Sequence, residues 1–116
     1  MSFTINEEKH YAHPVETVLQ AAVGAVGGLE GAVTVEQLDG LQAKFNKTIH
    51  GQVLGDRTEM KVSLKTAANG FCQVAVEIYP IDAVGHKMVF GARKGVARKV
   101  LDWYWAHLEH RLPNNS

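Results

Sequence analysis

The chain has 116 residues, the size of one ordinary domain, and its 46% hydrophobic and 21% charged content is typical of globular proteins. Its formal net charge is zero, so no overall field attracts nucleic acid or anionic lipid. No apolar run approaches the roughly 18 residues of a membrane span, and the N-terminus lacks the pattern of a signal peptide, so we expect one cytoplasmic domain over residues 1–116 with no membrane contact.

The first elements are expected to be a strand over residues 2–13 and a helix over residues 14–26. Pro14 suits the first helical position, and Gly27-Gly28 is expected to end the helix. One face of this helix is apolar at helical spacing. Its members are Val15, Val18, Leu19, Ala22, Val23 and Val26.

Four strands are expected next, because apolar and polar residues alternate with the period of a sheet that has one solvated face. Asp39-Gly40 is a strong hairpin signal. The expected strands span residues 32–38, 41–49, 58–66 and 71–79, with a loop at 50–57 and a linker at 80–87. Their inward positions include Leu41, Ala43, Phe45, Ile49, Met60, Val62, Leu64, Cys72, Val74, Val76 and Ile78.

A long helix over residues 88–111 is expected to close the domain. Trp103 and Trp105 flank its apolar face and diverge by about 200°, so one of them should lie near an edge. The apolar face itself consists of Val96, Ala97, Val100, Leu101, Tyr104 and Leu108. The fold class is therefore α+β: a two-layer β-α-β4-α domain whose mostly antiparallel five-stranded sheet carries a short helix and a long C-terminal helix on one face.

This order resembles the helix-grip arrangement of the TATA-binding-protein-like fold, and within it the small Bet v 1/START-related proteins. The stretches that carry the resemblance are "HYAHPVETVLQAA", "MKVSLKTAANGFCQVAVEIYPID" and "ARKGVARKVLDWYWAHLEHRL". The resemblance implies an apolar cavity between the sheet and the terminal helix. It brings no universal catalytic set.

The expected ligand is therefore an apolar small molecule held between the sheet and the terminal helix, without a cofactor. Its expected lining is Phe45, Met60, Leu64, Val76, Trp103 and Tyr104. The alternative interpretation is that these same residues fill a solid core.

A basic segment at the start of the terminal helix is the second candidate site. Its four cations, expected to hold an anion, are Arg93, Lys94, Arg98 and Lys99. The charged residues within 1–40 are mostly acidic, so the two segments are expected to face each other within the fold or across a dimer. The alternative is a nucleic-acid or polyanion partner, whose binding would weaken steeply with salt.

The sequence contains no pattern that demands catalysis or a metal. Cys72 lies within a strand rather than at a helix start, and no Cys/His metal spacing is present. Glu59 and Glu77 lie on adjacent strands, where ordinary ion pairing with lysine is expected. A non-catalytic binding domain is the favoured interpretation, and a purely structural or interaction protein stays open. A homodimer, if it forms, is expected through the helix face.

Overall fold

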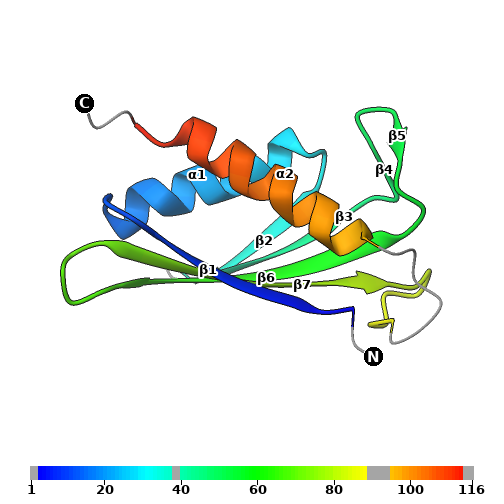
Figure 1. The fold of residues 1–116 in the computed structure, drawn as a ribbon, viewed down its shortest axis with the longest axis horizontal. Coiled ribbons are helices and arrows are strands. Elements are labelled where there is room, and N and C mark those ends of the chain that lie inside the picture. The colour runs from blue at the N-terminus through cyan, green and yellow to red at the C-terminus, as the bar shows by residue number, and fades with distance from the viewer. Residues whose placement is uncertain (1–2, 38–39, 89–94, 114–116) are drawn as a thin grey trace.

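Five strands form one antiparallel sheet in the order β1-β7-β6-β3-β2, and both helices lie across one of its faces (Figure 1). The computed structural model describes residues 3–37, 40–88 and 95–113. Its elements are β1 (Ile5–Tyr11), α1 (Val15–Gly28), β2 (Ala32–Gln37), β3 (Gly40–Phe45), β4 (Thr48–Ile49), β5 (Gln52–Val53), β6 (Arg57–Thr66), β7 (Cys72–Ile81) and α2 (Val96–Arg111). The predicted two-layer α+β class is confirmed.

The hydrophobic core lies between the sheet and the two helices. The predicted inward positions of β3, β6 and β7 are all buried, as the alternation of the sequence requires. The Tyr104 ring of α2 packs edge-on against Phe45 of β3, with ring centroids 6.5 Å apart. The Tyr104 hydroxyl donates a hydrogen bond to the carbonyl oxygen of Ala22 in α1 at 3.1 Å. Tyr104 therefore joins both helices to the sheet.

The first helix ends later than predicted. Gly27 and Gly28 form its last turn instead of terminating it. The chain leaves the helix at Leu29, whose side chain is 1% exposed and whose N–H donates to the carbonyl oxygen of Ala25 at 3.2 Å. Burial of this leucine holds the last turn in place, which outweighs the weak helix propensity of the two glycines.

The predicted strand over residues 41–49 is interrupted, and this part of the expectation is wrong. β3 ends at Phe45, and a separate short hairpin of β4 and β5 occupies part of the predicted loop (Figure 1). The hairpin turns at His50 and Gly51, which both have positive φ angles. Ile49 is buried as predicted, but it reaches the core from this hairpin.

The terminal helix begins at Val96 rather than at Met88. The N–H of Met88 donates to the carbonyl oxygen of Pro80 at 2.9 Å, which extends the pairing around β7. Gly95 has a φ angle of 85° and lies in the left-handed region, so it cannot continue a right-handed helix backwards. Residues 89–94, also predicted to be helical, lie outside the described residues.

Candidate functional site

An apolar pocket lies between the first turn of α2 and the neighbouring ends of β1 and β7, with a volume of about 260 Å³. The antiparallel register places Ile5, at the start of β1, opposite Ile78 of β7, so the beginning of β1 and the end of β7 meet here. The pocket is lined by Phe3, Ile5, Pro80, Gly95, Val96, Ala97 and Arg98. It therefore occupies the general region, between sheet and terminal helix, where a ligand was predicted.

The charge of Arg98, at the rim of this pocket, is balanced by two carboxylates. Its guanidinium donates to a Glu7 carboxylate oxygen and, at 2.6 Å, to Asp102. Glu7 also accepts a hydrogen bond from the Trp105 indole N–H at 2.8 Å. The hydrogen bond from Arg98 is the main reason why the pKa of Glu7 lies below its ordinary value. The rim is consequently polar without a free positive charge at Arg98.

β1 contacts α2 again within the last turn of the helix. Glu109 accepts hydrogen bonds from the Lys9 ammonium at 3.3 Å and from the Tyr11 hydroxyl at 2.7 Å. The Lys9 ammonium also lies 5.0 Å from the centroid of the Trp105 ring. The pairing of Glu7 with Arg98 is one contact within the fold of the kind predicted between the acidic first third and the basic helix start. The contacts of Lys9 and Tyr11 with Glu109 have the opposite charge arrangement and were not predicted.

The residues predicted to line a ligand cavity are mostly core residues. Of the six, five are at most 2% exposed, namely Phe45, Met60, Leu64, Val76 and Tyr104. Trp103 is only partly buried, whereas Trp105 is 3% exposed. The two tryptophans thus diverge as predicted. In this structure the five buried side chains belong to the packed core, and the apolar pocket at the start of α2 is built from other residues.

The predicted anion site is only partly described. Arg93 and Lys94 lie outside the described residues. The Lys99 ammonium lies 5.8 Å from the centroid of the Trp103 ring, and Arg98 is paired as above. Binding of nucleic acid or another polyanion through this segment stays a prediction.

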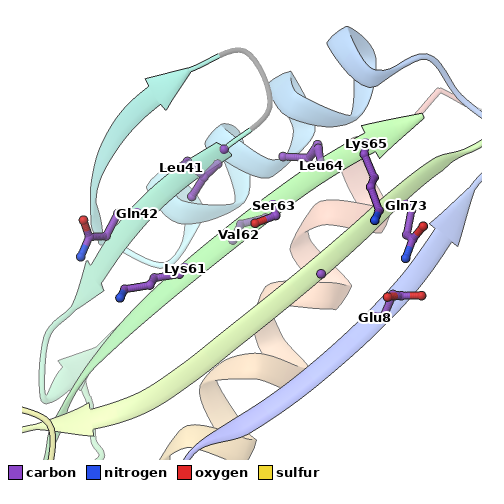
Figure 2. Close-up of a pocket in the computed structure, with 11 residues that line it drawn as sticks. Glu8, Leu41, Gln42, Lys61, Val62, Ser63, Leu64, Lys65 and Gln73 are labelled. Carbon is purple, nitrogen blue, oxygen red and sulfur yellow. The ribbon is translucent and has the colours of Figure 1, made fainter. Parts of the chain in front are cut away.

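The outer face of the sheet carries an open depression of about 690 Å³ (Figure 2). Its floor is a row of small cross-strand neighbours, Gly40, Ser63 and Ala75. Long polar side chains of both charge signs surround this row: Glu8, Gln42, Lys61, Lys65 and Gln73. Such a mixed polar surface is typical of the solvated face of an antiparallel sheet.

Glu59 is an almost buried carboxylate on this outer face. It accepts hydrogen bonds from the Tyr79 hydroxyl at 2.5 Å and from the Gln42 amide at 3.1 Å. The Lys44 ammonium lies 3.9 Å from its second oxygen. The cross-strand ion pairing predicted for Glu59 is thereby confirmed, and its predicted companion Glu77 is the register partner of Lys61.

A cluster of histidines joins the β4–β5 hairpin to both helices. The backbone N–H of His50 donates to the Glu30 carboxylate at 2.5 Å, and the ring Nε2 of His50 lies 2.6 Å from the carbonyl oxygen of Gly28. The His50 ring stacks on His107 of α2 with centroids 6.5 Å apart. A guanidinium nitrogen of Arg111 lies 3.1 Å from the His107 ring. Among the described residues, no group of three His, Cys, Asp or Glu side chains suits a metal ion.

We expect the domain to lose stability as the pH falls below 6.5, the ordinary pKa of histidine. Burial, and then the charges of Arg111, His50 and His110, hold the pKa of folded His107 below that value. The unfolded chain therefore takes up the proton first, so the stabilisation that is complete above pH 6.5 is lost on acidification. Urea unfolding at pH 7.5 and pH 5 measures this loss.

The variant His107→Asn should unfold with a smaller pH dependence than the unsubstituted protein. His86→Asn is the matched control, because the His86 side chain is 81% exposed. An identical pH dependence for the unsubstituted protein and the His107 variant would contradict the prediction.

Thr58→Val is expected to raise the free energy of unfolding by about 1 kcal/mol. The Thr58 side chain is 0% exposed, and its hydroxyl has no hydrogen-bond partner among the described residues. A buried polar group without a partner costs about 1–3 kcal/mol, which an apolar group of similar shape avoids. Urea denaturation measures the change, and Thr58→Ser, which keeps the hydroxyl, should show no gain. A loss of stability in Thr58→Val would mean that the hydroxyl has a partner, such as an ordered water.

The sequence pattern did not indicate the pocket at the start of α2. Phe3 and Ile5 alternate as strand residues do, and Val96 and Ala97 belong to the predicted apolar helix face. Nothing local shows that these two segments meet beside Pro80. Their proximity depends on the pairing of β1 with β7 and on the point where α2 begins.

No protein-family model matches the chain, and no curated protein matches it. Among solved structures, the crystal structure of Ara h 8.0201 is similar with 13% sequence identity and a TM-score of 0.43, over 96% of this chain and 98% of that chain. By its strand order and helix positions the chain is an α+β domain whose long C-terminal helix crosses an antiparallel sheet. Within the described residues, no helix is long and apolar enough to cross a membrane.

Proposed function

We propose that this chain is a small binding domain whose ligand is an uncharged apolar molecule held between the sheet and the first turn of α2. The observation that supports the proposal is the lining of the pocket at that place. Its apolar members are Phe3, Ile5, Pro80, Val96 and Ala97. Binding sites for small molecules are mostly apolar and contain a few polar groups that orient the ligand.

The volume of the pocket sets the size of the ligand. An apolar cavity of about 150 Å³ accommodates benzene, so about 260 Å³ suits a single ring or a chain of about six carbons. Complete burial contributes about 0.8 kcal/mol per methylene group, so six carbons gain at most about 5 kcal/mol in this pocket, which is partly open to solvent. The cost of association is of similar size and offsets most of this gain, so binding should be weak, with a Kd above about 1 mM.

The charge state of the rim favours a neutral ligand over an anion. Arg98 is the charged member of the lining, and its guanidinium is already paired with Glu7 and Asp102. An incoming carboxylate would compete with two carboxylates that the fold holds in place. An alcohol gives up less hydration on entering an apolar site than a carboxylate does.

An NMR titration with 1-hexanol, and in parallel with hexanoate, tests this proposal. We expect saturable shifts of the Ile5, Val96 and Ala97 amide signals with 1-hexanol, with a Kd above about 1 mM. Hexanoate should bind more weakly. Ala97→Leu fills the pocket and should abolish the shifts, whereas Ala75→Leu, on the outer face of the sheet, should leave them unchanged.

Shifts that never saturate, or that spread evenly over the outer face, would refute the proposal. Ile5→Ser provides a second test that does not depend on the larger side chain in Ala97→Leu, because it removes apolar lining without adding volume. It should weaken 1-hexanol binding several-fold while the spectrum stays that of a folded protein. Unchanged affinity in both variants would likewise refute the site.

A further inference from the structure

The two edge strands of the sheet, β1 and β2, differ in how they are protected. Edge strands present unpaired backbone donors and acceptors, and proteins often shield them with charged side chains that point inward. β1 follows this rule. Glu7 and Lys9 lie opposite Val76 and Val74, whose side chains are buried, and both charged side chains contact α2.

β2 lacks this protection over residues 32–35. Each of these four residues is exposed, and Val33 and Val35 are 37% and 48% exposed. The register places the two valines opposite Ala43 and Leu41, which are buried beneath the helices. Both valines therefore lie on the helix side of the sheet. The apolar layer of the sheet therefore continues, partly exposed, to the edge strand β2.

We infer that β2 pairs antiparallel with β2 of a second copy of this chain, so that two five-stranded sheets join edge to edge. The composition of the exposed segment supports a strand as the occupant. Val33, Thr34 and Val35 are β-branched, the residue type that strands favour. Two identical strands are mutually complementary when they run antiparallel about a two-fold axis, which makes a second copy the simplest partner.

The side-chain pattern selects the register of this pairing. Residues directly opposite each other in an antiparallel pair point to the same face. In the joined sheet the helices of both copies lie on the same face. Val33 and Val35, which point to that face, must therefore lie opposite residues that also point to it, and these are the odd-numbered residues of β2. The register that pairs both valines sets Val33 opposite Val35 and places Thr34 on the two-fold axis. Because a bulge follows Val35, the regular pairing is short and the dimer should be weak.

Sedimentation equilibrium from about 10 µM to about 1 mM tests the inference, with a dimer Kd expected near 100 µM, about 5.5 kcal/mol. Val33→Lys combined with Val35→Lys should raise this Kd at least tenfold, because lysines on an edge oppose pairing. The matched control is Val53→Lys combined with Val84→Lys, since these valines are 75% and 76% exposed elsewhere. The control should dimerise like the unsubstituted protein.

Oxidative cross-linking of a Thr34→Cys variant tests the register independently of affinity. Opposed residues in an antiparallel pair have Cα atoms about 4.5–5.5 Å apart, which lies within the range that a disulfide spans. The native Cys72 is fully buried and burial raises the pKa of its thiol, so it should not compete. We expect a cross-linked dimer from Thr34→Cys and none from Val84→Cys.

A protein that stays monomeric at about 1 mM would overturn the inference, and would leave the β2 edge to a strand of another protein or to none. A dimer that survives the two lysines on β2, or that the control lysines disrupt equally, would overturn it as well. Equal cross-linking of the two cysteine variants would reject the register. The inference does not depend on the proposed ligand, because β2 contributes no residue to that pocket.

Discussion

Replacing Phe45 by alanine is expected to lower the free energy of unfolding by about 3–5 kcal/mol, the usual cost of truncating a buried aromatic side chain. Phe45 is 1% exposed and packs edge-on against Tyr104, so its removal leaves a void between the sheet and α2. Core packing is dense, and the surrounding side chains relax only partly into such a void. Urea denaturation at pH 7.5 measures the loss.

Phe71→Ala is the matched control, because Phe71 is 40% exposed. Its effect should be at most about 1 kcal/mol, as for other surface substitutions. The comparison separates the two interpretations of the residues predicted to line a ligand cavity. A solid core predicts the large loss for Phe45→Ala. A loss no greater than that of the control would indicate that Phe45 borders open space. It would then support a ligand site at the centre of the domain.

Replacing Gly31 by alanine is expected to cost about 2 kcal/mol, although it adds only one methyl group. A Cβ atom at this position would lie 2.7 and 2.8 Å from two ring carbons of Phe45 and 2.9 Å from a methyl group of Val26. Both neighbours are buried in the core and cannot swing out into solvent. The turn between α1 and β2 must then move away from the core. Thermal or urea unfolding measures the effect.

Gly27→Ala, four residues earlier, should act in the opposite direction. A Cβ atom there has no neighbour within 4 Å, and the residue lies in α1. Alanine is favoured over glycine by about 0.8–1.0 kcal/mol in a helix interior, so the gain in the last turn of α1 should be at most this large. A further check is to combine Gly31→Ala with Phe45→Leu: the two changes should cost less together than the sum of their separate costs. Equal effects of the two glycine substitutions would show that the clash at Gly31 is relieved without cost.

The substitutions Phe45→Ala and Gly31→Ala also test where a ligand can bind. If Phe45 and Gly31 show the behaviour of a dense core, the space between the sheet and α2 is filled over most of its length. An apolar molecule then has room only where the helix begins, beside Ile5 and Val96. A positive 1-hexanol titration together with a large loss in Phe45→Ala would support this arrangement.

The alternation of apolar residues was enough to predict the class of this fold. Met60, Val62 and Leu64 point inward and Lys61, a charged residue between them, points outward, as the two-residue period of a strand requires. The corresponding argument from the helical period predicted that Tyr104 and Leu108 of the last helix lie in the core, where they are found. These are local properties, since each depends on neighbours a few positions away in the chain.

The interruptions of the regular elements were predicted less well. The left-handed conformation of Gly95 moved the start of the last helix to Val96, and the β4–β5 hairpin divided a predicted strand after Phe45. Glycine permits such a conformation without requiring it, so the sequence leaves both outcomes open. In the structure, where the strand is divided, Ile49 is buried in the core from the β4–β5 hairpin, and this is a long-range contact.

The candidate site and the two edges of the sheet were decided only by the tertiary structure. Phe3 and Pro80 become neighbours of Ala97 because β1 pairs with β7 and α2 crosses above them. Val33 has the same alternating pattern as the valines of β7, yet it stays 37% exposed on the edge strand β2. The periodicity of the sequence predicts which face of its element a side chain occupies. Whether another element covers that face depends on packing between segments far apart in the chain, which periodicity does not record.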